Sequence, residues 1–157
     1  MEFTVNIDLN MEGFKEIEKA CTAISKSIEV GILHNPKEAQ IGYLQHYGGT
    51  GVYQYGEHEG ESVDIPPRPF IMAPVDEFGG TILQQSAKKH FKFTEDSANK
   101  TLDIAGKTMA EDIKYWMDRK GAYPPDNSER TIETKGFNHP LIDKGTLRDS
   151  VEYEVVK

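Results

Sequence analysis

Five histidines are the first candidates for chemistry, because imidazole can bind a metal ion or transfer a proton near neutral pH. None of them lies in an H-E-x-x-H or H-x-H pattern, and the single cysteine, Cys21, excludes a C-x-x-C pair. His34 precedes a possible capping asparagine, His46 ends a predicted helix, His58 lies in an acidic stretch, and His139 precedes a proline. We therefore expect surface or capping roles for them, and we predict neither a metal site nor a cofactor.

Acidic residues offer a second possibility, since "GEHEGE" at 56–61 could hold a cation weakly through Glu57, Glu59 and Glu61. The stretch lacks the ligand spacing and the closing glutamate of a calcium loop. A solvated, charged loop is the preferred interpretation. A metal-dependent hydrolase or nuclease that uses Glu57, Glu59 and Asp64 stays as an alternative.

Nucleophilic and phosphate-binding motifs are weaker still. A phosphate cradle requires a glycine-rich turn that precedes a helix, whereas residues 48–51 ("GGTG") follow a predicted helix. No G-x-S-x-G elbow is present. Cys21 falls on the apolar face of a predicted helix, where a free cysteine is usually a small buried hydrophobe. Trp116 is expected in the core, with Tyr115 and Met117 beside it. The sequence does not predict an enzyme.

Residues 65–70, "IPPRPF", hold three prolines in six residues, a composition that suits neither a helix interior nor a central strand. The prolines make a rigid elbow that carries one arginine, and the elbow closes a long glycine-rich stretch at 49–64. Arg68 in the elbow and Arg148 near the end of the chain each fit two interpretations, a surface salt bridge or an anchor in a protein interface. In the second interpretation Phe70 would fill a pocket.

Composition limits the possible partners. A chain of 157 residues is most simply one domain, 1–157, and its formal net charge of −8 argues against duplex DNA as an affinity partner. The same charge suits a protein past which DNA slides. The first ten residues show no signal peptide and no window approaches a membrane span, so we expect synthesis in the cytosol.

The elements that must position these residues follow from hydrophobic periodicity. Alternation over 3–9 and 28–32 predicts strands, and a stripe from Met11 to Ile24 predicts a helix capped by Asn10. Asn35 and Pro36 begin a second helix, which Gly48 and Gly49 end. Its expected buried stripe is Ile41, Leu44 and Tyr47.

The stretch at 49–64 is expected to be a long loop or a flexible hairpin. Two long helices follow the elbow, the first over 75–91 with a break or kink at Gly79-Gly80. The second covers 98–116, is capped by Thr94 or Asp96, and ends before Gly121. A short helix capped by Asp126, a turn at 143–145 and a strand at 150–156 complete the chain.

Several motifs in this order resemble one family, the neck and tail-completion proteins of long-tailed bacteriophages, which include virion morphogenesis and minor tail proteins. The motifs are "VGIL", "AQIGYLQHYGG", "IPPRPFI", two long helices and "PLIDKGTLRDSVEYEV". The resemblance covers about residues 27–157. Lys144 departs from the usual small residue of its turn, His46-Tyr47 replaces an acidic–aromatic pair, and the stretch before the elbow is long.

The resemblance implies an α+β fold, a small antiparallel sheet with several packed helices and a long glycine-rich loop or arm. It implies a non-enzymatic virion protein that forms a homomeric ring, a hexamer, at the head–tail junction or at the head-proximal end of the tail. The partners would be other copies of the chain, head–tail connector, tail terminator or tail tube proteins, and DNA that passes through without specific binding. A host-directed binding protein is a further alternative.

The interface residues that the resemblance implies are architectural. They are Pro66, Pro67, Arg68, Pro69, Phe70, Leu141, Asp143, Gly145, Leu147 and Arg148. On this interpretation, alanine at Arg68 and Phe70 should disturb assembly more than the folding of the monomer.

Overall fold

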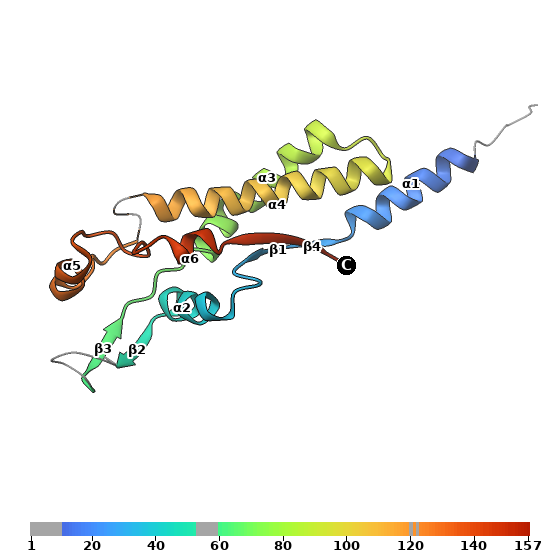
Figure 1. Ribbon diagram of the computed structural model, residues 1–157. Helices are drawn as coiled ribbons and strands as arrows, with labels where there is room; N and C mark the ends of the chain where they lie inside the picture. The colour runs from blue at the N-terminus through green and yellow to red at the C-terminus, as the bar shows by residue number, and fades with distance from the viewer. Residues whose placement is uncertain (1–10, 53–59, 120, 122) are drawn as a thin grey trace, which may run out of the picture.

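A computed structural model describes residues 11–52, 60–119, 121 and 123–157. This part of the chain has an α+β fold of six helices and two small two-stranded antiparallel sheets (Figure 1). The expected α+β class with antiparallel strands is therefore confirmed. The predicted strand at 3–9, its neighbour Asn10 and most of the glycine-rich stretch lie outside the described residues.

Helix α4 (Glu95–Asp118) lies at the centre of the fold, and α1, α3 and the sheet formed by β1 and β4 all pack against it. Thr94 caps the helix, because its side chain accepts a hydrogen bond from the Ser97 backbone amide. The predicted stripe from Ala98 to Ile113 is buried. The last turn differs from the prediction, since Met117 is fully buried and Trp116 is only partly covered.

Helix α3 (Met72–His90) packs along α4 and is continuous through Gly79-Gly80, so the predicted break is wrong, while the alternative of a kink stays a prediction. Gly79 is buried against Met109, whose Cε would lie 3.3 Å from a Cβ at this position. The glycine thus brings two helices close together while the hydrogen-bonded helix continues.

Helix α1 (Met11–Ile24) packs on α4 mainly through its C-terminal half, where Ala20 and Ala23 are buried. The opposite end extends away from the body of the protein (Figure 1). Phe14 and Ile17 are exposed outside the contact with α4. Cys21, in the C-terminal half, is also exposed, contrary to the prediction that it is buried.

Strand β1 (Ser27–Gly31) pairs antiparallel with β4 (Glu152–Val156), in a register that places Val30 opposite Tyr153. The pair lies against α4, where the Tyr153 ring covers Gly106 and the Tyr153 hydroxyl donates to Asp103 Oδ1 at 2.8 Å. Both strands were predicted from alternation, and their packing on a helix is what alternation implies.

Helix α2 (Pro36–Tyr47) starts as predicted, with Asn35 Oδ1 accepting from the Glu38 backbone amide. Its buried residues are Glu38, Gly42 and His46, so the predicted stripe of Ile41, Leu44 and Tyr47 is wrong. A Cβ on Gly42 would lie 2.7 Å from Ile32 Cδ1 and 3.3 Å from Leu147 Cδ1. The face of α2 that contains Gly42 therefore packs on the core, and Tyr47 stays exposed.

The remaining elements are short. Strands β2 (Gly49–Val52) and β3 (Ser62–Ile65) pair antiparallel, which confirms the hairpin alternative for these ends of the glycine-rich stretch. Helix α5 (Glu129–Lys135) is capped by Ser128 instead of the predicted Asp126. Helix α6 (Thr146–Asp149), which the sequence did not predict, follows the turn at 143–145. None of the described helices is long and apolar enough to cross a membrane.

Two glycines inside helices should respond to alanine with opposite signs. A Cβ at Gly106 would overlap the Tyr153 ring, whereas a Cβ at Gly80 would meet nothing within 4 Å. We expect Gly80→Ala to stabilise the protein by about 0.5–1 kcal/mol through helix propensity. We expect Gly106→Ala to destabilise it, because displacing the ring costs about 1–3 kcal/mol and exceeds the propensity gain.

Urea unfolding of both variants measures this difference. Equal stabilisation by the two substitutions would contradict the close packing of β4 on α4.

Candidate functional site

The proline elbow (65–70) and the late motif "PLIDKGTLRDSVEYEV" (140–155), two of the segments that carry the resemblance, meet in one core. Phe70 from the elbow is fully buried and clusters with Ile113 of α4 and with Leu147 and Val151 of the late motif. Residues about 75 positions apart in the sequence thus share one packed site. The sequence presents the two motifs as separate segments, and their contact is a result of the structure.

Arg68 ties the elbow to two other segments. Its side chain is buried, and Nε and Nη2 donate to the backbone oxygens of Tyr123 (3.3 Å) and Pro125 (2.9 Å). Nη1 donates to Gln45 Oε1 at 3.3 Å, and the backbone amide donates to the Gln45 carbonyl at 2.9 Å. These acceptors are all uncharged, and burial lowers the pKa of Arg68 from its ordinary value. Arg68 therefore acts as a hydrogen-bonding clamp within the chain.

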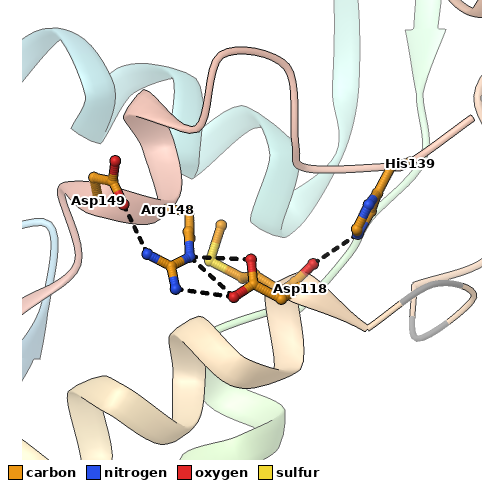
Figure 2. A network of polar contacts seen from close by, with 5 residues as sticks. Asp118, His139, Arg148 and Asp149 are labelled. Carbon is orange, nitrogen blue, oxygen red and sulfur yellow. Dashed lines mark hydrogen bonds and ion pairs between the residues drawn. The ribbon is translucent and has the colours of Figure 1, made fainter. Parts of the chain in front are cut away.

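Arg148 has a different environment, at the end of α4 (Figure 2). Nε and Nη2 donate to the Asp118 carboxylate at 2.9–3.1 Å, and Nη1 donates to Asp149 Oδ1 at 2.8 Å. Hydrogen bonds to Asp118 and Asp149 raise the pKa of Arg148. His139 Nε2 lies 3.0 Å from the Met117 carbonyl oxygen, so the segment that leads into the late motif also contacts this helix end. The salt-bridge interpretation of Arg148 is the one that the structure shows.

The predicted interface residues divide by exposure. Arg68, Phe70 and Leu147 are buried inside the chain and have intramolecular partners. Alanine at Arg68 or Phe70 should therefore also destabilise the single chain, and the expectation that it disturbs assembly more than folding stays a prediction. The other members are exposed or partly exposed, and their interface role stays a prediction: Pro66, Pro67, Pro69, Leu141, Asp143, Gly145 and Arg148.

A cleft of about 440 Å³ lies between α2, α5 and the late motif. Leu141 and Asp143 line it, together with Lys37 and Lys135. Leu141 has a φ of 67°, an uncommon backbone conformation for a branched residue, and it begins the turn that leads to Gly145 at φ 83°. Burial lowers the pKa of Lys135, while Asp143 opposes that shift. The cleft therefore offers charges of both signs beside the predicted interface residues.

A second, smaller hollow of about 220 Å³ lies between α2 and the start of α3 and is mostly apolar. Tyr43, Tyr47 and Met72 line its exposed part, and His46 lies at its buried side. The sequence predicted a surface or capping role for His46, but the residue is 6% exposed and its ring packs edge-on against Phe70 at 5.4 Å between centroids. Neither ring nitrogen has a hydrogen-bond partner in the described residues. His46 is buried because α2 packs against the elbow, and no local sequence pattern predicts that contact.

His46 should make stability depend on pH. Burial lowers its pKa, so the unfolded chain takes up a proton at a higher pH than the folded chain does. This contribution to stability is complete above pH of about 6.5, the ordinary histidine value, and is lost as the pH falls below it. We expect His46→Leu to flatten the dependence of the urea midpoint on pH between about 7 and 5. An unchanged slope in the variant would contradict a buried, neutral imidazole.

The acidic candidates for a metal site are only partly within the described residues. Glu57, His58 and Glu59 lie outside them, and Asp64 is an exposed residue of β3 that accepts from Thr50 Oγ1 at 3.3 Å. In the described ranges, no three His, Cys, Asp or Glu side chains are placed to hold a metal ion.

Comparisons with known proteins add no relative. No protein-family model, no curated protein and no solved structure matches this chain.

Proposed function

We propose that this chain is a structural subunit of the neck of a long-tailed bacteriophage. Copies of it would form a homomeric ring, of six subunits by the resemblance, around the channel through which DNA passes. The ring would join the head to the tail, or complete the tail at its head-proximal end. Its neighbours would be connector, tail terminator or tail tube proteins.

The observation that carries the proposal is the contact between the two recognised motifs. Phe70 of "IPPRPF" and Leu147 of "PLIDKGTLRDS" pack in the same core. A chance occurrence of two short motifs would not require that they build one site. Their convergence supports the interpretation that both belong to a single architectural unit.

Surface properties add support. Tyr43, Tyr47, Met72 and Val52 are exposed apolar side chains on and beside α2, and aromatic and methionine side chains are enriched in protein interfaces. The net charge of −8 suits passage of DNA without adhesion.

Electron microscopy of intact particles that carry a label on this chain tests the proposal. We expect the label in a ring at the head–tail junction, where the copies can be counted. A label at the capsid surface or the distal tail, or a particle without any label, would overturn the proposal.

A further inference from the structure

An apolar groove of about 690 Å³ runs beside the outer edge of strand β1. Ile28 and Val30 of β1 line one side, Val75 and Leu83 of α3 line the other, and Leu102 and Met109 of α4 form the floor. No residue of β4 lines this groove, whereas β4 occupies the other edge of β1. The groove therefore lies where a further strand of the same sheet would lie.

The edge of β1 that faces this groove is open in the described part of the chain. The sheet there has two strands, in the order β1-β4, so half of the β1 backbone amide and carbonyl groups face away from β4. An added strand would satisfy these groups and place every second side chain on the apolar floor. The occupant that fits is an extended segment with apolar residues at alternate positions.

The chain itself contains such a segment immediately before α1. Phe3, Val5, Ile7 and Leu9 alternate with polar residues in "FTVNIDL", the pattern of a strand that is covered on one face. We propose that residues 3–9 of one copy add as a strand to the open edge of β1 in a neighbouring copy.

Distance decides between the same copy and another copy. Helix α1 has 14 residues, so Met11 lies about 21 Å along the helix axis from the end that adjoins β1. Residues 3–9 span about 23 Å when fully extended. To reach the groove of its own copy, the segment would have to run back along α1. Almost all of its length would be used before it reached Ile24, where the groove begins. Because α1 extends away from the body (Figure 1), its N-terminal end lies far from the groove of its own copy, which favours a groove in another copy.

This inference deepens the proposed function, on which it depends for the ring. Each copy is both a donor and an acceptor of a strand, so the contact is head-to-tail, and such contacts close into a ring when the rotation between copies permits. Helix α1 then acts as the spacer between neighbouring subunits.

Cysteine cross-linking of the full-length chain tests the exchange, in a background where the exposed Cys21 is replaced by serine. Copies with Thr4→Cys, Asn6→Cys or Asp8→Cys, on the polar face, are each mixed with copies that carry Glu29→Cys in β1, which is exposed. We expect at least one donor to form a disulfide between copies, because paired strands bring Cα atoms to about 5 Å. Copies with Glu133→Cys in the distant helix α5 are the matched control (Figure 1).

A second readout is native mass spectrometry of the double variant Val5→Asp/Ile7→Asp. We expect it to lose assembly and keep the melting temperature of the monomer, whereas Thr4→Asp/Asn6→Asp on the opposite face keeps assembly. Cross-linking is measured on the purified chain and on assembled particles. The inference would be overturned if, in both preparations, cross-links to Glu29→Cys were no more frequent than those to Glu133→Cys. A chain that carries both a donor cysteine and Glu29→Cys is also tested, and a disulfide that forms only within this chain would overturn the inference as well.

These outcomes are separate from the test of the proposed function. A label at the head–tail junction without cross-links would reject strand exchange and leave the neck role. Cross-linked copies with the label elsewhere on the particle would reject the neck role and leave strand exchange.

Discussion

Phe70→Ala is expected to lower the free energy of unfolding by about 3–5 kcal/mol, the usual cost of removing a buried aromatic ring. Phe70 is fully buried, and its ring packs against His46 and the core around Ile113 and Leu147. The prolines that precede it hold the backbone in place, so the surrounding residues have little freedom to fill the cavity. Urea unfolding followed by Trp116 fluorescence measures the change.

The control for this prediction is Phe93→Ala, because Phe93 is 62% exposed in the loop between α3 and α4. We expect it to alter stability by less than about 0.5 kcal/mol. A Phe70→Ala variant that unfolds like the wild type but fails to assemble would restore the interface interpretation of this residue. The structure argues for the opposite result, since the ring has no exposed surface to offer a neighbouring subunit.

Long-range periodicity was a reliable guide to the elements of this fold. The α4 stripe repeats over five turns, so its buried face could be read directly, and the strands that became β1 and β4 alternate as predicted. Local start signals were equally informative at Asn35 and at Thr94. These features depend on interactions within a few residues, which the sequence contains in full.

The errors arose where a distant contact decides the outcome. The apolar stripe of α1 predicted a buried Cys21, but α4 covers the neighbouring Ala20 and Ala23 instead. Gly79 looked like a helix break and is a contact point between helices. In each case a small residue permits close approach, and a pattern based on large apolar residues does not register it.

The candidate site followed the same division. The elbow and the late motif could be recognised from their letters, and the prolines correctly predicted that residues 66–69 belong to no helix or strand. The sequence could not show that Phe70 and Leu147 meet, because about 75 residues separate them. It also could not separate the two arginines, since a buried clamp and a surface ion pair need the same side chain.

The second large loss of stability is expected at Arg68, and Arg148 serves as its comparison. Arg68→Met keeps an apolar stem of similar length but removes every donor to the carbonyls of Tyr123 and Pro125. A buried acceptor left without a donor costs about 1–3 kcal/mol, which applies to the Tyr123 carbonyl, and the part-buried Pro125 carbonyl should cost less, so we expect a total loss of about 2–4 kcal/mol. Arg148→Met removes the guanidinium that pairs with two carboxylates. It should cost at most about 1 kcal/mol, because water solvates the freed Asp118 and Asp149.

The arginine with only uncharged partners should therefore matter more to folding than the arginine with two ion pairs. Arg68→Lys refines the test, because one ammonium group cannot reach the three acceptors, on two segments, that the guanidinium spans. We expect lysine to recover less than half of the loss in urea unfolding. Equal losses at Arg68 and Arg148 would show that charge, and not burial, determines the contribution of each residue. If Arg68 proves essential to folding, tests of assembly at the elbow must use its exposed members, Pro67 and Pro69.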